Sequence, residues 1–176
     1  EELQHALDRG APIYAEVKGF GSAFVGGKQH PPETRVARAE KAMSAAVEDA
    51  GIKKEDVQLI SANANGCKLQ DAVEAKAIQS LFGASGGRIP ISAIKSNLGE
   101  SYGAAGTAQI ISTLMSINTG QIPHIINHSN NDPEINLNLI LEKPAKKEIQ
   151  HAMINNMDYD GNNSCLMVSK FDINSL

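Results

Sequence analysis

The stretch that decides the fold is a glycine-punctuated loop that leads into an apolar segment, Lys95-Ser96-Asn97-Leu98-Gly99-Glu100-Ser101-Tyr102-Gly103-Ala104-Ala105-Gly106. Residues 90–94 before it predict a short strand, so the loop lies at the carboxyl end of that strand. Residues 103–118 after it predict a helix. Small and apolar side chains occupy nearly every face of this helix, which predicts that it is buried on most sides.

Strand and helix predictions alternate outward from this stretch. The patterns predict helices over 1–10, 33–50 and 70–82, and strands over 12–19, 57–62, 151–156 and 164–170. A long loop is predicted at a cluster of breakers, Gly19, Gly21, Gly26, Gly27 and Pro31-Pro32. Residues 120–132 predict a loop with a short strand. The alternation predicts an α/β domain with helices layered around a mixed central sheet.

Composition excludes several classes of function. The chain has 176 residues, a formal net charge of -4, 41% hydrophobic and 20% charged residues, which is typical of one globular domain. No basic stripe favours nucleic acid, and no apolar run approaches the roughly 20 residues of a membrane helix. Two cysteines, Cys67 and Cys165, make neither a disulfide framework nor a zinc site, so we expect a cytoplasmic protein without metal or cofactor.

The stretch 95–106 resembles the Lys-Ser-x-x-Gly-His-x-x-x-Ala-Ala-Gly signature of β-ketoacyl synthases, the condensing enzymes of fatty-acid and polyketide assembly. Similar segments follow the family's order along the chain, at residues 2–17, 49–52, 55–57, 120–123 and 131–134. The resemblance implies a thiolase-like fold, of which residues 1–176 would be the single C-terminal half-domain. The nucleophilic cysteine would belong to the absent N-terminal half, and the sheet of this half would have an exposed edge.

Two positions depart from the family's chemistry. The family uses two histidines as hydrogen-bond donors to the malonyl thioester carbonyl, where negative charge develops. Asn63 stands at the first, in the run Ser61-Ala62-Asn63-Ala64-Asn65, and Glu100 stands at the second. A carboxylate about 4 Å from a like charge repels it by about 4 kcal/mol at an effective dielectric near 20, or about three orders of magnitude in rate. A protonated Glu100 could donate instead, but only with a strongly raised pKa. The resemblance therefore implies no catalytic residue in this half.

Other family positions are kept or altered. Lys95 and Glu74 match a lysine and a glutamate that the resemblance implies to be a structural charge pair. The family's acyl-channel gating loop, Gly-Phe-Gly-Gly-Thr-Asn, is altered to Asp158-Tyr159-Asp160-Gly161-Asn162-Asn163. For Asn63, capping of a turn or helix and a remnant ligand contact remain equal alternatives. Cys67 is expected to be an idle thiol, and His124 and His128 are weak metal candidates.

With Asn63, Glu100 and the 158–163 loop altered together, the sequence resembles the chain-length factor, the ketosynthase-like β-subunit of type II polyketide synthases. The resemblance implies a non-catalytic subunit that pairs with an active ketosynthase and an acyl carrier protein and shapes the pocket for the growing polyketide or fatty acyl chain. One alternative is an active β-ketoacyl synthase with its cysteine in the missing half. Another is a stand-alone interaction module without an acyl ligand.

Overall fold

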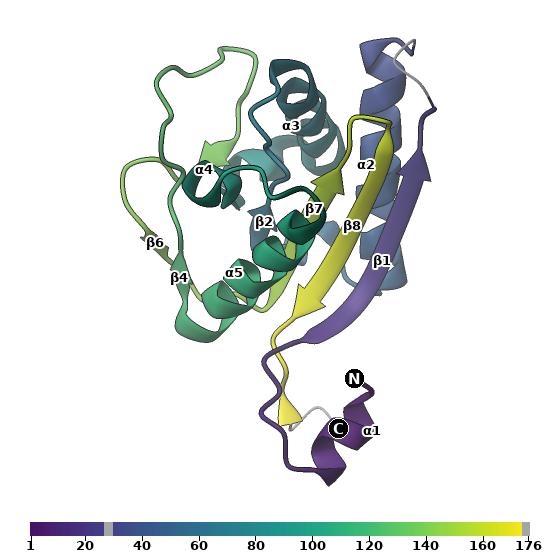
Figure 1. Cartoon of the computed structure of the whole chain (residues 1–176), viewed down its shortest axis with the longest axis vertical. Helices are drawn as coiled ribbons and strands as arrows, with labels where there is room; N and C mark the ends of the chain where they lie inside the picture. Colours follow the sequence, from purple (N-terminus) through teal and green to yellow (C-terminus); the bar gives the residue numbers. More distant parts are fainter. Residues whose placement is uncertain (27–29, 174–176) are drawn as a thin grey trace.

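The computed structural model describes residues 1–26 and 30–173 (Figure 1). Its helices are α1 Leu3–Asp8, α2 Pro32–Asp49, α3 Lys68–Phe82, α4 Lys95–Leu98 and α5 Ala105–Thr119, with short 3-10 helices η1 Lys54–Asp56, η2 Gly83–Arg88 and η3 Tyr102–Ala104. The strands are β1 Glu16–Phe24, β2 Leu59–Ser61, β3 Pro90–Ser92, β4 Gln121–Ile122, β5 Asn138–Leu139, β6 Ala145–Lys146, β7 His151–Met157 and β8 Asn162–Ser169.

Six strands form one mixed sheet in the order β1-β8-β7-β2-β3-β5. The central strands β7, β2, β3 and β5 run parallel, whereas β8 is antiparallel to both β7 and β1. Strands β4 and β6 make a separate antiparallel pair. The predicted α/β class and mixed central sheet are confirmed. Strand β1 lies at one edge of the sheet.

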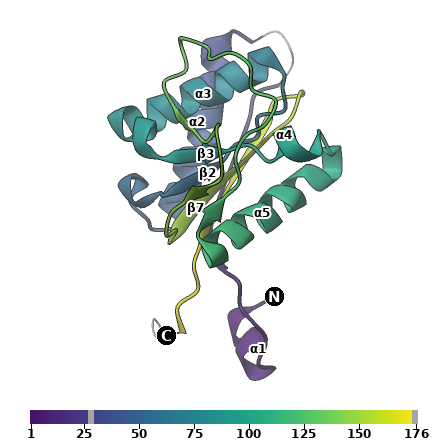
Figure 2. The ribbon, with the colours of Figure 1, turned by 90° about the vertical axis from the view of Figure 1, so that its left-hand side faces the viewer.

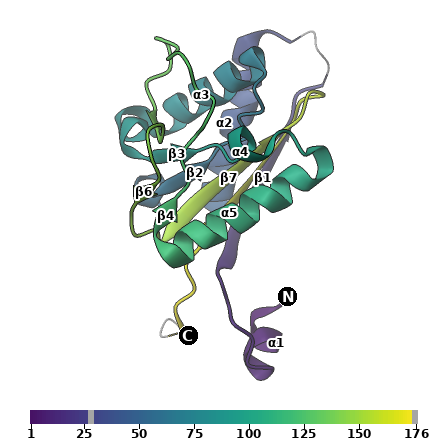
Figure 3. The same ribbon diagram turned by 60° about the vertical axis from the view of Figure 1, so that its left-hand side comes forward.

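Helices cover both faces of the sheet. Figure 2 shows α2 and α3 on one side and α5 on the other, and Figure 3 shows α5 running across the sheet with α4 near the strand ends. Helix α1 lies apart from the sheet (Figure 1). The described helices include none that is both long enough and apolar enough to cross a membrane.

An apolar core lies between the sheet and each of the two helix layers. Between the sheet and α2 and α3 lie the fully buried side chains of Met43, Ile60, Ile78, Met153 and Met167, among others. Between the sheet and α5, the buried cluster is Leu59, Ile117, Ile122, Ile149, Ala152, Ile154 and Val168. The alternation of burial along β8 sends successive side chains to these two cores.

The predicted strand over 12–19 and the loop after it are corrected. Strand β1 begins at Glu16 and runs through Gly19 and Gly21. A Cβ atom at Gly21 would lie 2.0 Å from the Ala42 carbonyl oxygen, and one at Gly19 would lie 2.4 Å from that of Ala46. These glycines therefore allow the backbone of α2 to pack directly on β1, rather than marking a loop. Gly27, also placed in that loop, lies outside the described residues.

The prediction of a helix buried on most sides is wrong for α5. Ile111 and Met115 are 54% and 62% exposed, whereas Gln109, Thr113, Ser116 and Ile117 are buried. The buried residues recur at helical spacing and face the sheet, but nothing in the described residues covers the opposite face. The loop of residues 95–106 also differs from its prediction, because it contains α4 and η3.

Candidate functional site

The site is built around the turn that follows β2. The backbone N–H groups of Asn63 and Ala64 donate to the two carboxylate oxygens of Glu74, over 2.8 and 2.9 Å. Ala64 has a φ of 33°, which is uncommon for a residue with a Cβ atom. Glu74 is 3% exposed and lies on α3. Its carboxylate therefore holds a turn that the backbone does not favour by itself.

Asn63 links this turn to two other segments. Its Oδ1 atom accepts from Lys95 Nζ at 2.7 Å and from the backbone N–H of Met157, at the end of β7, at 3.2 Å. Asn63 is 1% exposed. It does not cap α3, because the N-cap residue of that helix is Cys67. Capping of a helix by Asn63 is therefore excluded, and its side chain serves as a buried junction between Lys95 and β7.

Lys95 pairs with Glu100. The Nζ atom of Lys95 lies 3.0 Å from Glu100 Oε2, and the lysine is 8% exposed. The other carboxylate oxygen of Glu100 accepts the backbone N–H of Tyr102 at 2.9 Å. The direct charge pair of Lys95 with Glu74 that the resemblance implied is not formed. Asn63 stands between them, since its side chain accepts from Lys95 while its N–H donates to Glu74.

The pKa values of Glu74 and Glu100 are shifted in opposite directions. Burial raises the pKa of Glu74 above its ordinary value and outweighs the hydrogen bonds that it accepts from Ala64, Asn63 and Asn155. Burial also acts to raise the pKa of Glu100, but the hydrogen bond from Lys95 and those from the backbone bring it below its ordinary value. Glu100 is therefore a carboxylate at neutral pH, and a carboxylate only accepts hydrogen bonds.

The altered loop of residues 158–163 is a closed hairpin turn between β7 and β8. Asp158 Oδ1 accepts from the N–H groups of Asp160 and Asn162 at 2.9 and 2.8 Å, and its Oδ2 accepts from the Asn162 amide at 2.6 Å. Burial opposes ionisation of Asp158, but these bonds hold its pKa below the ordinary value. Asn163 Nδ2 donates to the carbonyl groups of Ala23 and Gly161.

A cavity of about 1010 Å³ opens beside the Lys95–Glu100 pair. Its charged lining consists of Asp71, Glu74, Lys95, Glu100 and Asp132, and its apolar wall includes Ile78, Ile91, Ile125, Ile126, Ile135, Leu137, Leu139 and Leu141. Asn63 is not among the lining residues, so only the second of the two altered positions faces the cavity. The cavity is large enough for a chain-like ligand, because typical ligand pockets measure roughly 300–1,000 Å³.

Three buried amides complete the site and were not predicted. Gln109 Nε2 donates to the carbonyl groups of Ser61, Ala62 and Asn155 over 3.4, 2.9 and 2.9 Å. Asn155 Nδ2 donates to Glu74 Oε1 at 3.0 Å, and Gln70 bonds the hairpin turn. In the sequence, the sign of Gln109 was a polar residue inside the apolar segment 103–118. The sign of Gln70 was its position four residues before Glu74, which puts both side chains on one helix face.

In the described residues, no side chain of the remaining candidates, Cys67, Cys165, His124 and His128, is hydrogen-bonded to this network. Cys67 and Cys165 are free thiols, and burial raises the pKa of Cys165 well above its ordinary value. His128 contacts Asn131, with 2.7 Å between Nε2 and Oδ1. Within residues 1–26 and 30–173, no three His, Cys, Asp or Glu side chains gather as metal ligands would.

Comparison with known proteins agrees with this architecture. Residues 14–129 match the family model described as "Beta-ketoacyl synthase, C-terminal domain". A 3-oxoacyl-[acyl-carrier-protein] synthase 2 from Staphylococcus aureus strain COL is 33% identical over 172 residues, which are 98% of this chain and 42% of the relative. The Coxiella burnetii protein of that name is 31% identical over 170 residues, 97% of this chain and 41% of the relative. The chain thus spans about two fifths of the length of these curated relatives.

Two solved structures overlay nearly all of the chain. The ishigamide ketosynthase/chain length factor has a TM-score of 0.88 at 31% identity. The match covers 98% of this chain and 42% of the ishigamide chain. A type II polyketide synthase complex of an acyl-carrier protein with its ketosynthase, bound to the hexaketide, has a TM-score of 0.90 at 28% identity and the same coverage. The fold is therefore the thiolase-like fold of ketosynthases. The chain belongs to the β-ketoacyl synthase family, in which it corresponds to the C-terminal domain.

Proposed function

We propose that this chain is part of a non-catalytic ketosynthase-like subunit, of the chain-length-factor type, that pairs with an active ketosynthase. The observation that carries the proposal is the ion pair between Lys95 and Glu100, 3.0 Å long, at the position where the family has its second histidine. The cavity beside this pair would then help to bound the space for a chain attached to an acyl carrier protein.

The chemistry of condensation supports the loss of catalysis. An oxyanion needs preorganised hydrogen-bond donors where its charge develops. Glu100 cannot supply one, since its pKa is lowered and its oxygens accept from Lys95 and Tyr102. A donating, protonated Glu100 would require the opposite pKa shift. Asn63 turns its Oδ1 atom to Lys95 and Met157 within the protein, and it lies outside the cavity lining.

The proposed partners follow from the comparisons. One of the two solved structures is a ketosynthase/chain length factor, and the other is an acyl-carrier protein in complex with its ketosynthase. The match of the chain to about two fifths of such proteins also supports an N-terminal half of the same fold, either preceding this segment or supplied by another chain.

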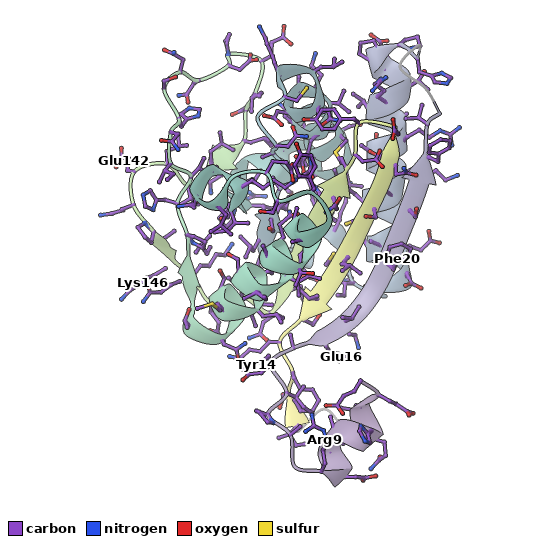
Figure 4. The ribbon with its side chains drawn as sticks, in the orientation of Figure 1. Arg9, Tyr14, Glu16, Phe20, Glu142 and Lys146 are labelled. Atoms are coloured by element: carbon purple, nitrogen blue, oxygen red, sulfur yellow. The ribbon has the colours of Figure 1, made fainter. Side chains whose placement is uncertain are left out.

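A surface on this domain fits that missing half. Phe20 and Phe24 on β1 are 53% and 60% exposed, and Ile111 and Met115 on α5 are 54% and 62% exposed. Figure 4 shows Phe20 on β1, at the edge of the sheet. An exposed group of large apolar side chains on one side of a domain is typical of a surface that another unit covers. We propose that the N-terminal half packs there.

The distribution of product lengths tests the proposal. The intact gene product is combined with a candidate ketosynthase and an acyl carrier protein, and the carrier-bound products are analysed by mass spectrometry. Ile125→Trp places bulk in the cavity and should shift the distribution to shorter chains. Ile173→Trp, at a position that is 56% exposed and outside the cavity lining, is the matched control. Identical lengths with the wild type, Ile125→Trp and Ile173→Trp would contradict the proposal.

The second candidate is an active β-ketoacyl synthase with atypical site residues. The names of the curated relatives favour it, because they are 3-oxoacyl-[acyl-carrier-protein] synthases. Its nucleophilic cysteine would lie in the N-terminal half. Replacement of that position by another residue in the gene would exclude the second candidate, and a cysteine there would favour it.

A further inference from the structure

The turn of residues 157–163 is attached on one side to α3. Gln70 Nε2 donates to the backbone carbonyl of Asp158 over 2.9 Å, and Gln70 Oε1 accepts from Asn65 Nδ2. Gln70 is 7% exposed. Its amide therefore spans the gap between the turn after β2 and the hairpin turn, with both of its polar atoms bonded. The N–H of Met157 donates to Asn63 on the same side.

The opposite side of the turn is attached to the end of β1. The N–H of Val25 donates to the Gly161 carbonyl at 3.0 Å, and Asn163 Nδ2 donates to the Ala23 carbonyl at 3.2 Å. Gly161 has a φ of 97°, and a Cβ atom there would lie 2.0 Å from the Val25 carbonyl oxygen. Backbone meets backbone at this contact, so the turn has no room to move toward β1.

The turn is also closed internally. Asp158 accepts three hydrogen bonds from within it, and the N–H of Asp158 donates to the Asn162 carbonyl at 3.0 Å. The cavity between the turn, Gln70 and Val73 measures about 20 Å³, which is room for about one water molecule. Little space is therefore left beneath the turn into which it could fold.

We propose that Gln70 is a positioning residue that latches the 157–163 turn closed, so that the turn is a fixed element and not a gate. This inference rests on the proposed function in one respect, since the resemblance to ketosynthases is what assigns an acyl-channel gate to these residues; the turn itself is not among the residues that line the large cavity. Opening the turn would break the hydrogen bonds of the Asp158 carbonyl and the Met157 N–H at once, and would leave the buried Gln70 Nε2 without its partner. Unpaired buried polar groups are costly, so the open form is scarcely populated.

Hydrogen–deuterium exchange of the intact gene product tests the latch. In the wild type, amides of residues 157–163 should exchange slowly, at rates near those of β7 and β8. Gln70→Leu keeps the bulk but removes both bonds, and should speed exchange in 157–163 by about tenfold while β2 and β3 change little. Gln121→Leu is the matched control, since Gln121 is exposed and its side chain has no hydrogen bond in the described part of the chain.

A conservative variant separates positioning from bulk structure. Gln70→Glu keeps the shape, but the introduced carboxyl can donate to the Asp158 carbonyl only when protonated. Protection of the turn, relative to the wild type at the same pH, should therefore return as the pH falls. Fast exchange of 157–163 in the wild type would overturn the latch, and so would equal exchange in the wild type and Gln70→Leu.

The exchange rates of residues 157–163 in the wild type test the latch even if Gln70→Leu fails to fold. No carrier-bound product enters this readout. A failure of the latch is therefore distinguishable from a failure of the chain-length role, which the Ile125→Trp product distribution reports.

Discussion

The ammonium group of Lys95 lies 2.7 Å from Asn63 Oδ1 and 3.0 Å from Glu100 Oε2, and so bonds both residues that the sequence resemblance places at the family's histidine positions. A lysine that is 8% exposed needs such partners, because an unpaired buried charge is strongly destabilising. The two altered positions are therefore parts of one compensated arrangement. Glu100 neutralises Lys95, and Asn63 is hydrogen-bonded in turn to Glu74 and to Met157 of β7.

Replacement of Glu100 by Gln should lower stability in a pH-dependent way. The folded-state pKa of Glu100 lies below its ordinary value of 4.5, so its contribution is complete above that pH and is lost as the pH falls through the folded pKa. The side chain is 25% exposed, which limits the loss to about 1 kcal/mol at pH 7. Urea unfolding at several pH values measures it. A difference between wild type and Glu100→Gln that does not shrink as the pH falls below 4.5 would contradict the assignment.

Replacement of Glu74 by Gln should cost more. The introduced NH₂ group must face the N–H of Ala64 or that of Asn63, so a buried donor loses its acceptor, at about 1–3 kcal/mol. Urea unfolding at neutral pH measures the change, with the exposed Glu48→Gln as control. Because the folded-state pKa of Glu74 is raised, wild-type stability from this group should fall as the pH rises from 4.5 through that pKa. Equal stability of Glu74→Gln and Glu48→Gln would contradict the role of the carboxylate.

Gln109 should be a strong determinant of stability although it does not itself line the cavity. Its amide donates to the carbonyl groups of Ala62, just after β2, and of Asn155 on β7, beyond the last residues through which the two strands pair. Gln109→Leu would leave these buried carbonyl groups with fewer donors, and we expect a loss of about 1–3 kcal/mol in the free energy of unfolding. Calorimetry or urea unfolding measures it. A neutral effect would show that the strand ends find other partners.

Gly21→Ala tests the close packing of α2 on β1. The added methyl group would lie 2.0 Å from the Ala42 carbonyl oxygen, so β1 or α2 must shift. Such overpacking costs typically about 1–3 kcal/mol and occasionally more. The matched control is Gly103→Ala, where a Cβ atom meets nothing within 4 Å, and this variant should be nearly neutral. Thermal unfolding of both variants compares them, and equal midpoints would contradict the packing.

The sequence predicted the elements whose patterns depend on local periodicity. The helices at 33–50 and 70–82 are confirmed, because one apolar face dictates each of them. The two C-terminal strands are also confirmed, because their short apolar runs are buried on both faces of the sheet. Strands β5 and β6 were not predicted, since two-residue strands carry no periodic signal. The loop predicted at Gly19 and Gly21 was wrong for a physical reason. A glycine that lets a neighbouring helix pack closely cannot be distinguished in the sequence from a glycine that bends a loop.

Four residues of the site were predicted, but its three buried amides and the connections between its residues were not. Asn63, Glu74, Lys95 and Glu100 were singled out, and the structure brings all four into one network. The pairing within it was not accessible, because the choice of Glu100 over Glu74 as the partner of Lys95 depends on the position of Asn63 between them. Gln70 and Gln109 act through carbonyl groups far along the chain, and no spacing in the sequence records such contacts.

The rate of decarboxylative condensation by the intact gene product, supplied with acyl and malonyl carrier protein and no other ketosynthase, tests the proposed loss of catalysis. We expect no product above background, because Glu100 accepts hydrogen bonds where a donor is required. Added to an active ketosynthase, the same protein should change the length of the products. Condensation by the unmodified protein alone would overturn the proposal.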